Sequence, residues 1–250
     1  MILHPSKKLA LLAFFILILS LAREVHAQPT SIGFESANKL YYEGKFPEAA
    51  SAYETLIRSG QKTAILYFNL GNALFKSGQV GRAIAAYRQA EQITPRDPDV
   101  RANLHFARNQ VQGPTLSSNR VEAWIGKLTL NEWAILATAS LWLFFLLLIL
   151  LQARPLLKPT LKFYILVSIF LTLFMGVCLA FSFYHQQMLK TAIVIAPDTV
   201  VREGPVETSR NAFPVHDGTE MRVLNEKEEW LQVSPDPSRV GWIRRDQVVL

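Results

Sequence analysis

The side chains that most often carry out catalysis or hold metal ions are few in this sequence, and they follow no catalytic spacing. Its five histidines lack the spacing of metal ligands, and its one cysteine, Cys178, lies inside an apolar block. No nucleophile turn, phosphate-binding loop or dinucleotide-binding glycine pattern is present. The sequence therefore predicts a protein that is not an enzyme and that holds no cofactor or metal.

A different chemistry, the hydrogen bonding of an extended peptide, is open to polar side chains between residues 35 and 103. A carboxamide both donates and accepts hydrogen bonds, so an asparagine can hold a peptide backbone. We expect a set of such side chains to line a partner-binding groove, the alternative being a solvated helical face. The set is Glu35, Lys39, Asn69, Asn72, Lys76 and Asn103. A full set of cations for gripping a carboxy-terminal carboxylate is absent.

The segment that must position these side chains repeats itself along the chain. Residues 34–41 align with residues 67–74 at an offset of 33, and one extra residue in the second copy then changes the offset to 34. At the second offset Gly44 aligns with Gly78, and a partial third copy begins near Asn103. We therefore expect the first copy to carry a one-residue deletion.

The period and the residue types resemble the tetratricopeptide repeat. The second copy matches best, with motif residues Tyr67, Leu70, Gly71, Gly78, Ala83, Tyr87, Ala90 and Pro95 in order and spacing. The resemblance implies an array of about five helices, packed as antiparallel pairs. It also implies a concave face that binds peptides or protein segments.

Two apolar blocks, residues 134–151 and 163–184, contain no Asp, Glu, Lys or Arg. At 1.5 Å per residue the shorter block extends about 27 Å, which is enough to cross the hydrocarbon core of a bilayer. The loop between them carries Arg154, Lys158 and Lys162, and such a basic loop favours the cytoplasm. We expect a two-helix transmembrane hairpin with both flanking segments outside the cytoplasm.

A third apolar block, residues 9–22, follows Lys7 and Lys8 and precedes a short polar stretch that ends at Ala27. This order is typical of a secretory signal peptide cleaved after Ala27, the alternative being an uncleaved anchor. A signal peptide exports the residues that follow it, which agrees with the orientation given by the basic loop.

The segment just before the first span combines a turn-rich linker with an apolar helical stripe. Val121, Trp124 and Ile125 recur at helical spacing. We expect an amphipathic helix on the membrane surface, with Trp124 and Trp133 at the depth of the headgroups. The alternative is one more helix of the repeat array.

After residue 190 the sequence changes to short β-rich runs separated by turn signals, which predicts a small barrel of five or six strands. The expected strands cover residues 192–196, 199–202, 221–224, 230–234 and 240–244. Several motifs resemble a bacterial SH3-like domain in order and spacing. They are Val201-Arg202-Glu203-Gly204-Pro205, Phe213-Pro214-Val215-His216-Asp217-Gly218-Thr219, Val223-Leu224, Trp230-Leu231-Gln232-Val233 and Gly241-Trp242-Ile243.

Two tryptophans of this segment, Trp230 and Trp242, are expected to pack the inside of the barrel, the alternative being contact with a ligand. The resemblance implies that such a domain binds peptides or cell-wall fragments. The net charge of +6 lies largely beside the apolar blocks, and neither soluble segment carries a basic stripe. Nucleic-acid binding is therefore not expected.

These features predict a multidomain membrane protein with an α-helical solenoid, a two-helix transmembrane hairpin and a small all-β SH3-like barrel. The expected parts before the hairpin are a signal peptide at 1–27, a tetratricopeptide-repeat domain at 30–112, and a linker with an interfacial helix at 113–133. The expected hairpin consists of a transmembrane helix at 134–152, a cytoplasmic loop at 153–162 and a second transmembrane helix at 163–185. The last expected part is an SH3-like domain at 191–250.

This order of parts resembles the BatE-type proteins of the Bat aerotolerance operons. The resemblance implies a non-enzymatic scaffold, acting in aerotolerance or stress beside von Willebrand factor A-domain membrane proteins and a MoxR-type ATPase. The expected location is the bacterial inner membrane, crossed twice, with both soluble domains on the periplasmic side. The alternative function is a peptidoglycan-binding sensor or tether of the cell wall.

Overall fold

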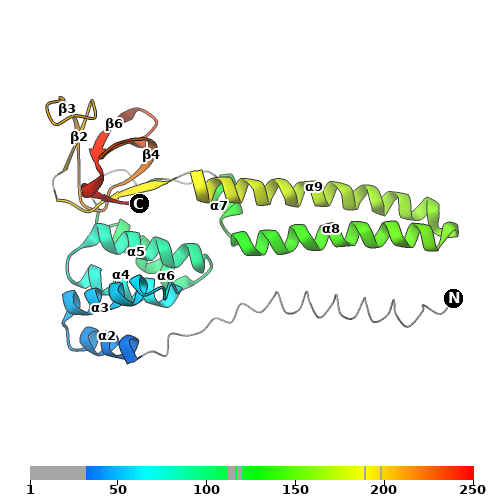
Figure 1. Ribbon diagram of the computed structural model, residues 1–250, viewed down its shortest axis with the longest axis horizontal. Helices are drawn as coiled ribbons and strands as arrows, with labels where there is room; N and C mark the ends of the chain where they lie inside the picture. The colour runs from blue at the N-terminus through cyan, green and yellow to red at the C-terminus, as the bar shows by residue number, and fades with distance from the viewer. Residues whose placement is uncertain (1–31, 112–115, 117–119, 189, 198) are drawn as a thin grey trace.

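A computed structural model describes residues 32–111, 116, 120–188, 190–197 and 199–250. The expected signal peptide and most of the expected linker lie outside the described residues. The described chain forms a helical array, then a long helical hairpin, then a β-sheet that lies over the array (Figure 1).

Five helices form the array. They are α2 (Ile32–Tyr42), α3 (Phe46–Arg58), α4 (Ala64–Lys76), α5 (Val80–Ile93) and α6 (Pro98–Arg108). Gly44 and Gly78 follow α2 and α4 with φ of 77° and 82°. Glycine adopts this left-handed conformation at little cost, so the chain can turn sharply into the second helix of each pair. Thr63 and Asp97 cap α4 and α6 by accepting backbone N–H groups.

The core of the array combines leucines and isoleucines with small residues and two tyrosines. Tyr53 and Tyr87 are 1% and 3% exposed, on α3 and α5. Gly71 of α4 faces the second ring so closely that an added Cβ would lie 2.6 Å from it. The glycine therefore lets α4 and α5 approach each other, as its place in the repeat motif predicts.

In the structure the repeat offset is 34 from the first helix onward. The offset of 33 predicted for the first helix was therefore wrong. The helices α2 and α4 end at Tyr42 and Lys76, and Gly44 and Gly78 follow them at equivalent places in the two turns. The two helix ends are therefore 34 residues apart, and so are the two glycines. The first copy carries no deletion.

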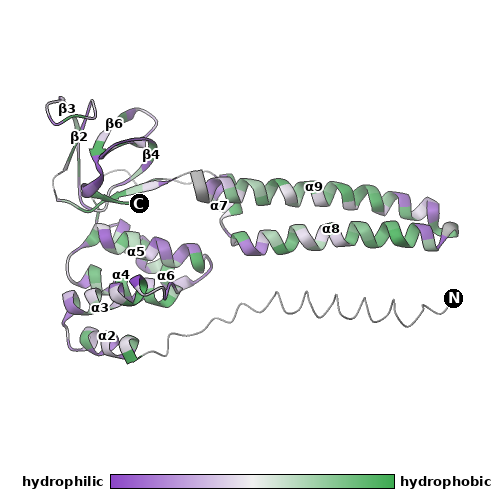
Figure 2. Ribbon diagram, in the orientation of Figure 1, coloured by the Kyte–Doolittle hydropathy of each residue, from purple (hydrophilic) through white to green (hydrophobic). Residues whose placement is uncertain are grey.

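A short helix, α7 (Arg120–Ile125), comes before the hairpin, which consists of α8 (Leu130–Ala153), a 3-10 turn η1 (Pro155–Leu157) and α9 (Lys158–Met188). Two of its helical segments, Leu130–Ala153 and Lys158–His185, are long and apolar enough to cross a membrane by length and composition. Figure 2 shows hydrophobic residues along most of both helices. Thr129 and Glu132 form a capping box at the start of α8.

The short helix α7 packs on the end of the hairpin from which the chain continues into the sheet. Ile125, Trp133 and Cys178 form a buried cluster there, and Trp133 Nε1 donates to the Ile125 carbonyl oxygen at 3.1 Å. The alternative prediction of a further array helix was therefore wrong. Trp133 is only 2% exposed and is covered by protein, whereas Trp124 is 49% exposed.

Seven strands form one antiparallel sheet in the order β3-β2-β6-β5-β4-β1-β7. They are β1 (Thr191–Val194), β2 (Thr199–Arg202), β3 (Asn211–Val215), β4 (Glu220–Lys227), β5 (Trp230–Asp236), β6 (Arg239–Arg244) and, after the 3-10 turn η2 (Arg245–Gln247), β7 (Val248–Val249). In the part of the chain that the structure describes, β3 and β7 do not pair with each other, so the sheet is not closed. The SH3-like barrel therefore stays a prediction.

One face of the sheet is buried, and the two tryptophans lie on the other. Leu231, Val233 and Ile243 are fully buried in the core of the sheet. Because side chains alternate along a strand, Trp230 and Trp242 point away from this core, and both are half-buried. The prediction that they pack the inside of a barrel was wrong.

Candidate interaction surfaces

The first candidate surface is a set of asparagines on α2, α4 and α6, held by tyrosines of the second helices. The Tyr53 hydroxyl donates to Asn38 Oδ1 at 2.6 Å, and Asn69 Nδ2 donates to the same oxygen at 3.3 Å. Burial raises the pKa of Tyr53 to about 12, so its hydroxyl keeps its proton to higher pH than that of an exposed tyrosine. The Asn38 carbonyl is therefore fixed by two donors.

The same unit occurs again at the equivalent place in the next repeat. The Tyr87 hydroxyl donates to Asn72 Oδ1 at 2.7 Å, and Asn103 Nδ2 donates to that oxygen at 2.9 Å. Burial again raises the pKa of the tyrosine. Two equivalent units thus connect the three first helices of the array, and we call the six residues of these units the asparagine ladder.

A small pocket of about 140 Å³ opens beside the first unit. Its lining residues are Asn38, Tyr41, Tyr42, Tyr53, Asn69 and Asn72. Tyr42 is 85% exposed and stands at its edge. The sequence identified two of these residues, Asn69 and Asn72, and missed the others.

Aromatic side chains continue this surface along the second unit. The rings of Phe75 and Phe106 lie 5.5 Å apart, and Phe106 is 56% exposed. Each lies three residues from an asparagine of the ladder, Asn72 or Asn103, so ring and amide share one side of their helix. The surface therefore offers amides beside apolar rings, which suits a peptide backbone and its side chains.

The charged residues predicted for the groove lie outside this pocket. Glu35, Lys39 and Lys76 are exposed, and Lys39 Nζ lies 3.9 Å from the Glu43 carboxylate on the same helix. Such an exposed pair contributes little binding energy. The structure therefore brings together the asparagines of the predicted set but not its charges.

The second candidate surface is the contact between the array and the sheet, where Glu220 of β4 is buried. Arg108 of α6 binds this carboxylate with two hydrogen bonds of 3.0 and 3.1 Å. Arg88 Nη1 of α5 lies 3.7 Å from it, within ion-pair distance. The Glu220 side chain is only 2% exposed, so water screens these pairs poorly. Burial lowers the pKa of Arg88, and Glu220 opposes that shift.

A turn of the sheet reaches the first residues of α5. The backbone N–H of Gly81 donates to both Asp217 carboxylate oxygens at 3.2 Å. A carboxylate at a helix start is stabilised by the free N–H groups and the helix dipole. A Cβ on Gly81 would lie 2.1 Å from the Val194 carbonyl oxygen and 2.3 Å from the Asp217 carboxylate. Only glycine fits at this contact.

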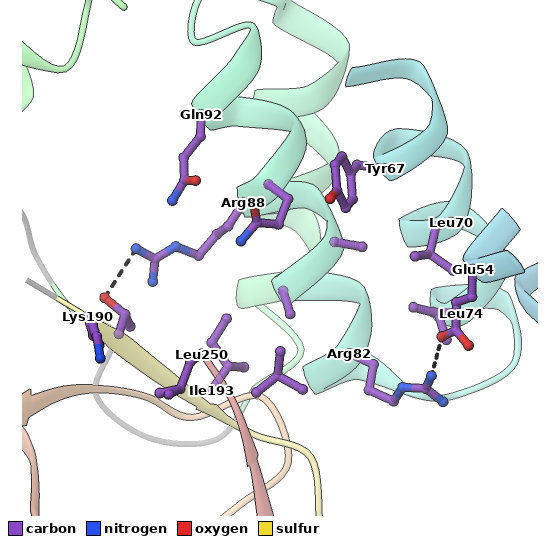
Figure 3. Close-up of a pocket in the computed structure, with 15 residues that line it drawn as sticks. Glu54, Tyr67, Leu70, Leu74, Arg82, Arg88, Gln92, Lys190, Ile193 and Leu250 are labelled. Carbon is purple, nitrogen blue, oxygen red and sulfur yellow. Dashed lines mark hydrogen bonds and ion pairs between the residues drawn. The ribbon is translucent and has the colours of Figure 1, made fainter. Parts of the chain in front are cut away.

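Beside this contact, a pocket of about 390 Å³ lies between α4, α5 and the strands β1 and β7 (Figure 3). Apolar side chains such as Leu70 and Ile193 lie next to three cations, Arg82, Arg88 and Lys190. Each cation has an acidic partner: Glu54, Glu220 and Glu226 respectively. The pocket therefore offers shape and apolar contact but little unpaired charge.

The array also contacts the hairpin. Arg96, in the loop before α6, binds the Glu132 carboxylate at the start of α8. On the other side, Arg222 of β4 lies 3.4 Å from Glu122 of α7. The three parts of the chain are therefore connected by ion pairs as well as by the backbone.

The outer face of the sheet carries the two tryptophans close together. Cross-strand pairing places Trp230 opposite Arg244, and Trp242 opposite Gln232, on the neighbouring strands β5 and β6. Arg202 pairs with Trp242 from β2. This face therefore combines aromatic rings with arginines. Among the described residues, no cluster of three or more His, Cys, Asp or Glu that could hold a metal is present.

Comparison with known families supports the helical part of this description. The sequence profile of the tetratricopeptide repeat matches residues 34–98, which cover most of α2, all of α3 to α5 and the turn into α6. No curated protein is significantly similar to the chain. The helical region is therefore similar to a tetratricopeptide repeat, a module whose usual role is to bind other proteins.

Proposed function

We propose that the protein is a non-enzymatic scaffold that binds an extended segment of a partner protein along the asparagine ladder. The observation that carries this proposal is the ladder itself, two equivalent polar units in a surface lined with aromatic rings. The match to a protein-binding repeat supports it. Membrane anchoring through α8 and α9 is part of the same proposal.

The hydrogen bonds within the ladder leave a defined set of groups for a ligand. The carbonyl oxygens of Asn38 and Asn72 are each occupied by two donors. Within the described chain, their own amide N–H groups have no protein acceptor, and they remain able to donate. Asn69 and Asn103 donate inside the ladder, so their oxygens remain able to accept.

Donors and acceptors in this arrangement match the C=O and N–H groups of an extended backbone. Backbone groups are common to all sequences, so the amides give affinity without selecting a residue type. The exposed rings of Tyr42 and Phe106 would contact the side chains of the segment and provide selection. The uncharged pocket favours a neutral segment over an acidic or basic one.

The proposed setting rests on the sequence and on its resemblance to BatE-type proteins. The two apolar helices would anchor the chain in the inner membrane, with the basic loop in the cytoplasm and both binding parts on the periplasmic side. By the same resemblance, the partners would be von Willebrand factor A-domain membrane proteins working with a MoxR-type ATPase.

The binding proposal can be tested with the full chain in detergent micelles and a library of random twelve-residue peptides. We expect selection to yield peptides that bind the protein. The double variant Asn38→Ala, Asn72→Ala should weaken their binding by about tenfold or more, since two hydrogen-bonding sites are lost. Asn225→Ala, an exposed residue of β4, is the matched control. Failure to enrich any peptide, or equal binding by the double variant, would contradict the proposal.

A second candidate function, attachment to peptidoglycan, is favoured by the outward position of Trp230 and Trp242. Aromatic rings on an open face can stack on sugar rings, whereas core tryptophans cannot. The test is sedimentation of the full chain with purified cell-wall sacculi. We expect the double variant Trp230→Ala, Trp242→Ala to stay in the supernatant; absence of pelleting by the unaltered protein would reject this candidate.

A further inference from the structure

The third repeat of the array has a first helix but no second helix packed on it in the described chain. The first helix described after α6 is α7, and α7 packs on the hairpin instead. A repeat array needs a cap at its last repeat, because each repeat buries its apolar face only against a neighbour. Within the described chain, the open side of α5 and α6 is therefore left for an element other than a helix to cover.

The sheet lies where this cover is needed, as the next layer above α5 (Figure 1). Ile193 of β1 is 3% exposed and belongs to the hydrophobic core of the array. Gly218 sits on the apolar end of the array: an added Cβ would lie 2.5 Å from Val111 and 3.1 Å from Ile84. The array and the sheet therefore share one continuous apolar contact.

Polar contacts hold the same surface together at two points. The Asp217 carboxylate accepts from the start of α5, and the Glu220 carboxylate binds Arg108 near the end of α6. At the other end of α6, the preceding loop is held by the ion pair of Arg96 with Glu132. Helix α6, the first helix of the third repeat, is thus fixed at one end by the sheet. At its other end, the loop before it is held by the hairpin.

We propose that the β-sheet domain is the cap of the repeat array, taking the place of the second helix of the third repeat, and that Glu220 is the positioning residue that holds α6. This role goes beyond the binding of a partner, and it does not depend on what the array binds. It gives the domain a function inside its own chain.

Hydrogen exchange of the full chain in detergent micelles tests the proposal. The amide of residue 81 reports docking, since it donates to Asp217, and the amides of α6 report the consequence. In Glu220→Gln we expect both to exchange about tenfold faster or more, with α2 and α3 unchanged. The matched control is Glu226→Gln, an exposed acid of the same strand that pairs with Lys190; it should leave both rates unchanged.

A second variant guards against a sheet that fails to fold. Gly81→Ala lies in α5, outside the sheet, and its methyl group would push the two parts apart. It should raise exchange at residue 81 and in α6 while the strands keep their protection. Faster exchange at residue 81 with unchanged α6 would overturn the proposal. So would unchanged rates at residue 81 in both variants, because the contacts would then not hold the domain.

Discussion

The asparagine ladder and the sheet-facing side of the repeat array differ in charge and in how they recur along the chain. The ladder is uncharged, and its Asn72 unit reproduces its Asn38 unit in the next repeat. The sheet-facing side depends on two carboxylates, Glu220, which pairs with arginines, and Asp217, which accepts from a backbone N–H. The described part of the array shows no second copy of these contacts.

This difference indicates that the asparagine ladder, and not the sheet-facing side, is available to a ligand. In the ladder each fixed amide keeps a free donor or acceptor, so a bound segment adds hydrogen bonds without breaking any. At the sheet the carboxylates are already paired, and a ligand that displaced one partner would leave the other charge buried and unpaired. A repeated neutral surface is therefore suited to binding, and a unique ionic one to holding the fold together.

The comparison is most sharply tested at Glu220. Replacing it by alanine should lower the free energy of unfolding by about 3–5 kcal/mol, since Arg88 and Arg108 would keep charges without a partner. Guanidinium titration followed by tryptophan fluorescence measures this. Glu226→Ala removes an exposed acid of the same strand and should cost far less, because water screens its ion pairs. Equal costs would mean that the sheet-facing contact is no stronger than a surface ion pair.

Smaller and equal effects are expected within the ladder. Tyr53→Phe and Tyr87→Phe each remove one hydrogen bond while keeping the ring, so each should cost about 1 kcal/mol. Because the two units are equivalent, the costs should agree within about 0.5 kcal/mol. The same unfolding titration measures both. A large difference between them would break the equivalence on which the proposed binding surface depends.

The smallest effect is expected at high pH. Tyr53 is an acid whose pKa is raised from 10.0 to about 12 by burial, so the folded state disfavours its charged form. Its contribution to stability should be complete below pH 10 and should be lost as the pH rises through 12. Absorbance at 295 nm should show late-titrating tyrosines. The double variant Tyr53→Phe, Tyr87→Phe should lose the latest of them and keep only the earlier-titrating Tyr41 and Tyr67, whose pKa values burial also raises; ordinary titration of every tyrosine in the unaltered protein would contradict this.

Most helices and strands could be predicted from the sequence, because their patterns are local. The repeat predicted a helical array, and alternation predicted the central parts of five strands. β3 contains Pro214 and lies at an edge of the sheet, where a missing N–H is tolerated, so its composition hid it. β7 has only two residues, too few for a pattern.

The ladder was predicted only in part because one alignment was displaced. Aromatic residues Phe34 and Tyr67 match at an offset of 33, and this match hid the equivalence of Asn38 and Asn72. At an offset of 34, Phe34 pairs with Phe68 and Ala37 with Gly71. A search for the longest ungapped repeat would have found Asn38 from the sequence.

What the sequence by itself determined is everything that depends on neighbours along the chain: the helical repeat, the two apolar helices, the β-rich segment and three of the four ladder asparagines. Only the tertiary structure decided that the β-sheet lies against the array and that its tryptophans face outward. Asp217 lies 136 residues from Gly81, and Glu220 lies 112 residues from Arg108. No periodicity joins residues so far apart, because their contact depends on how the separately folded parts pack.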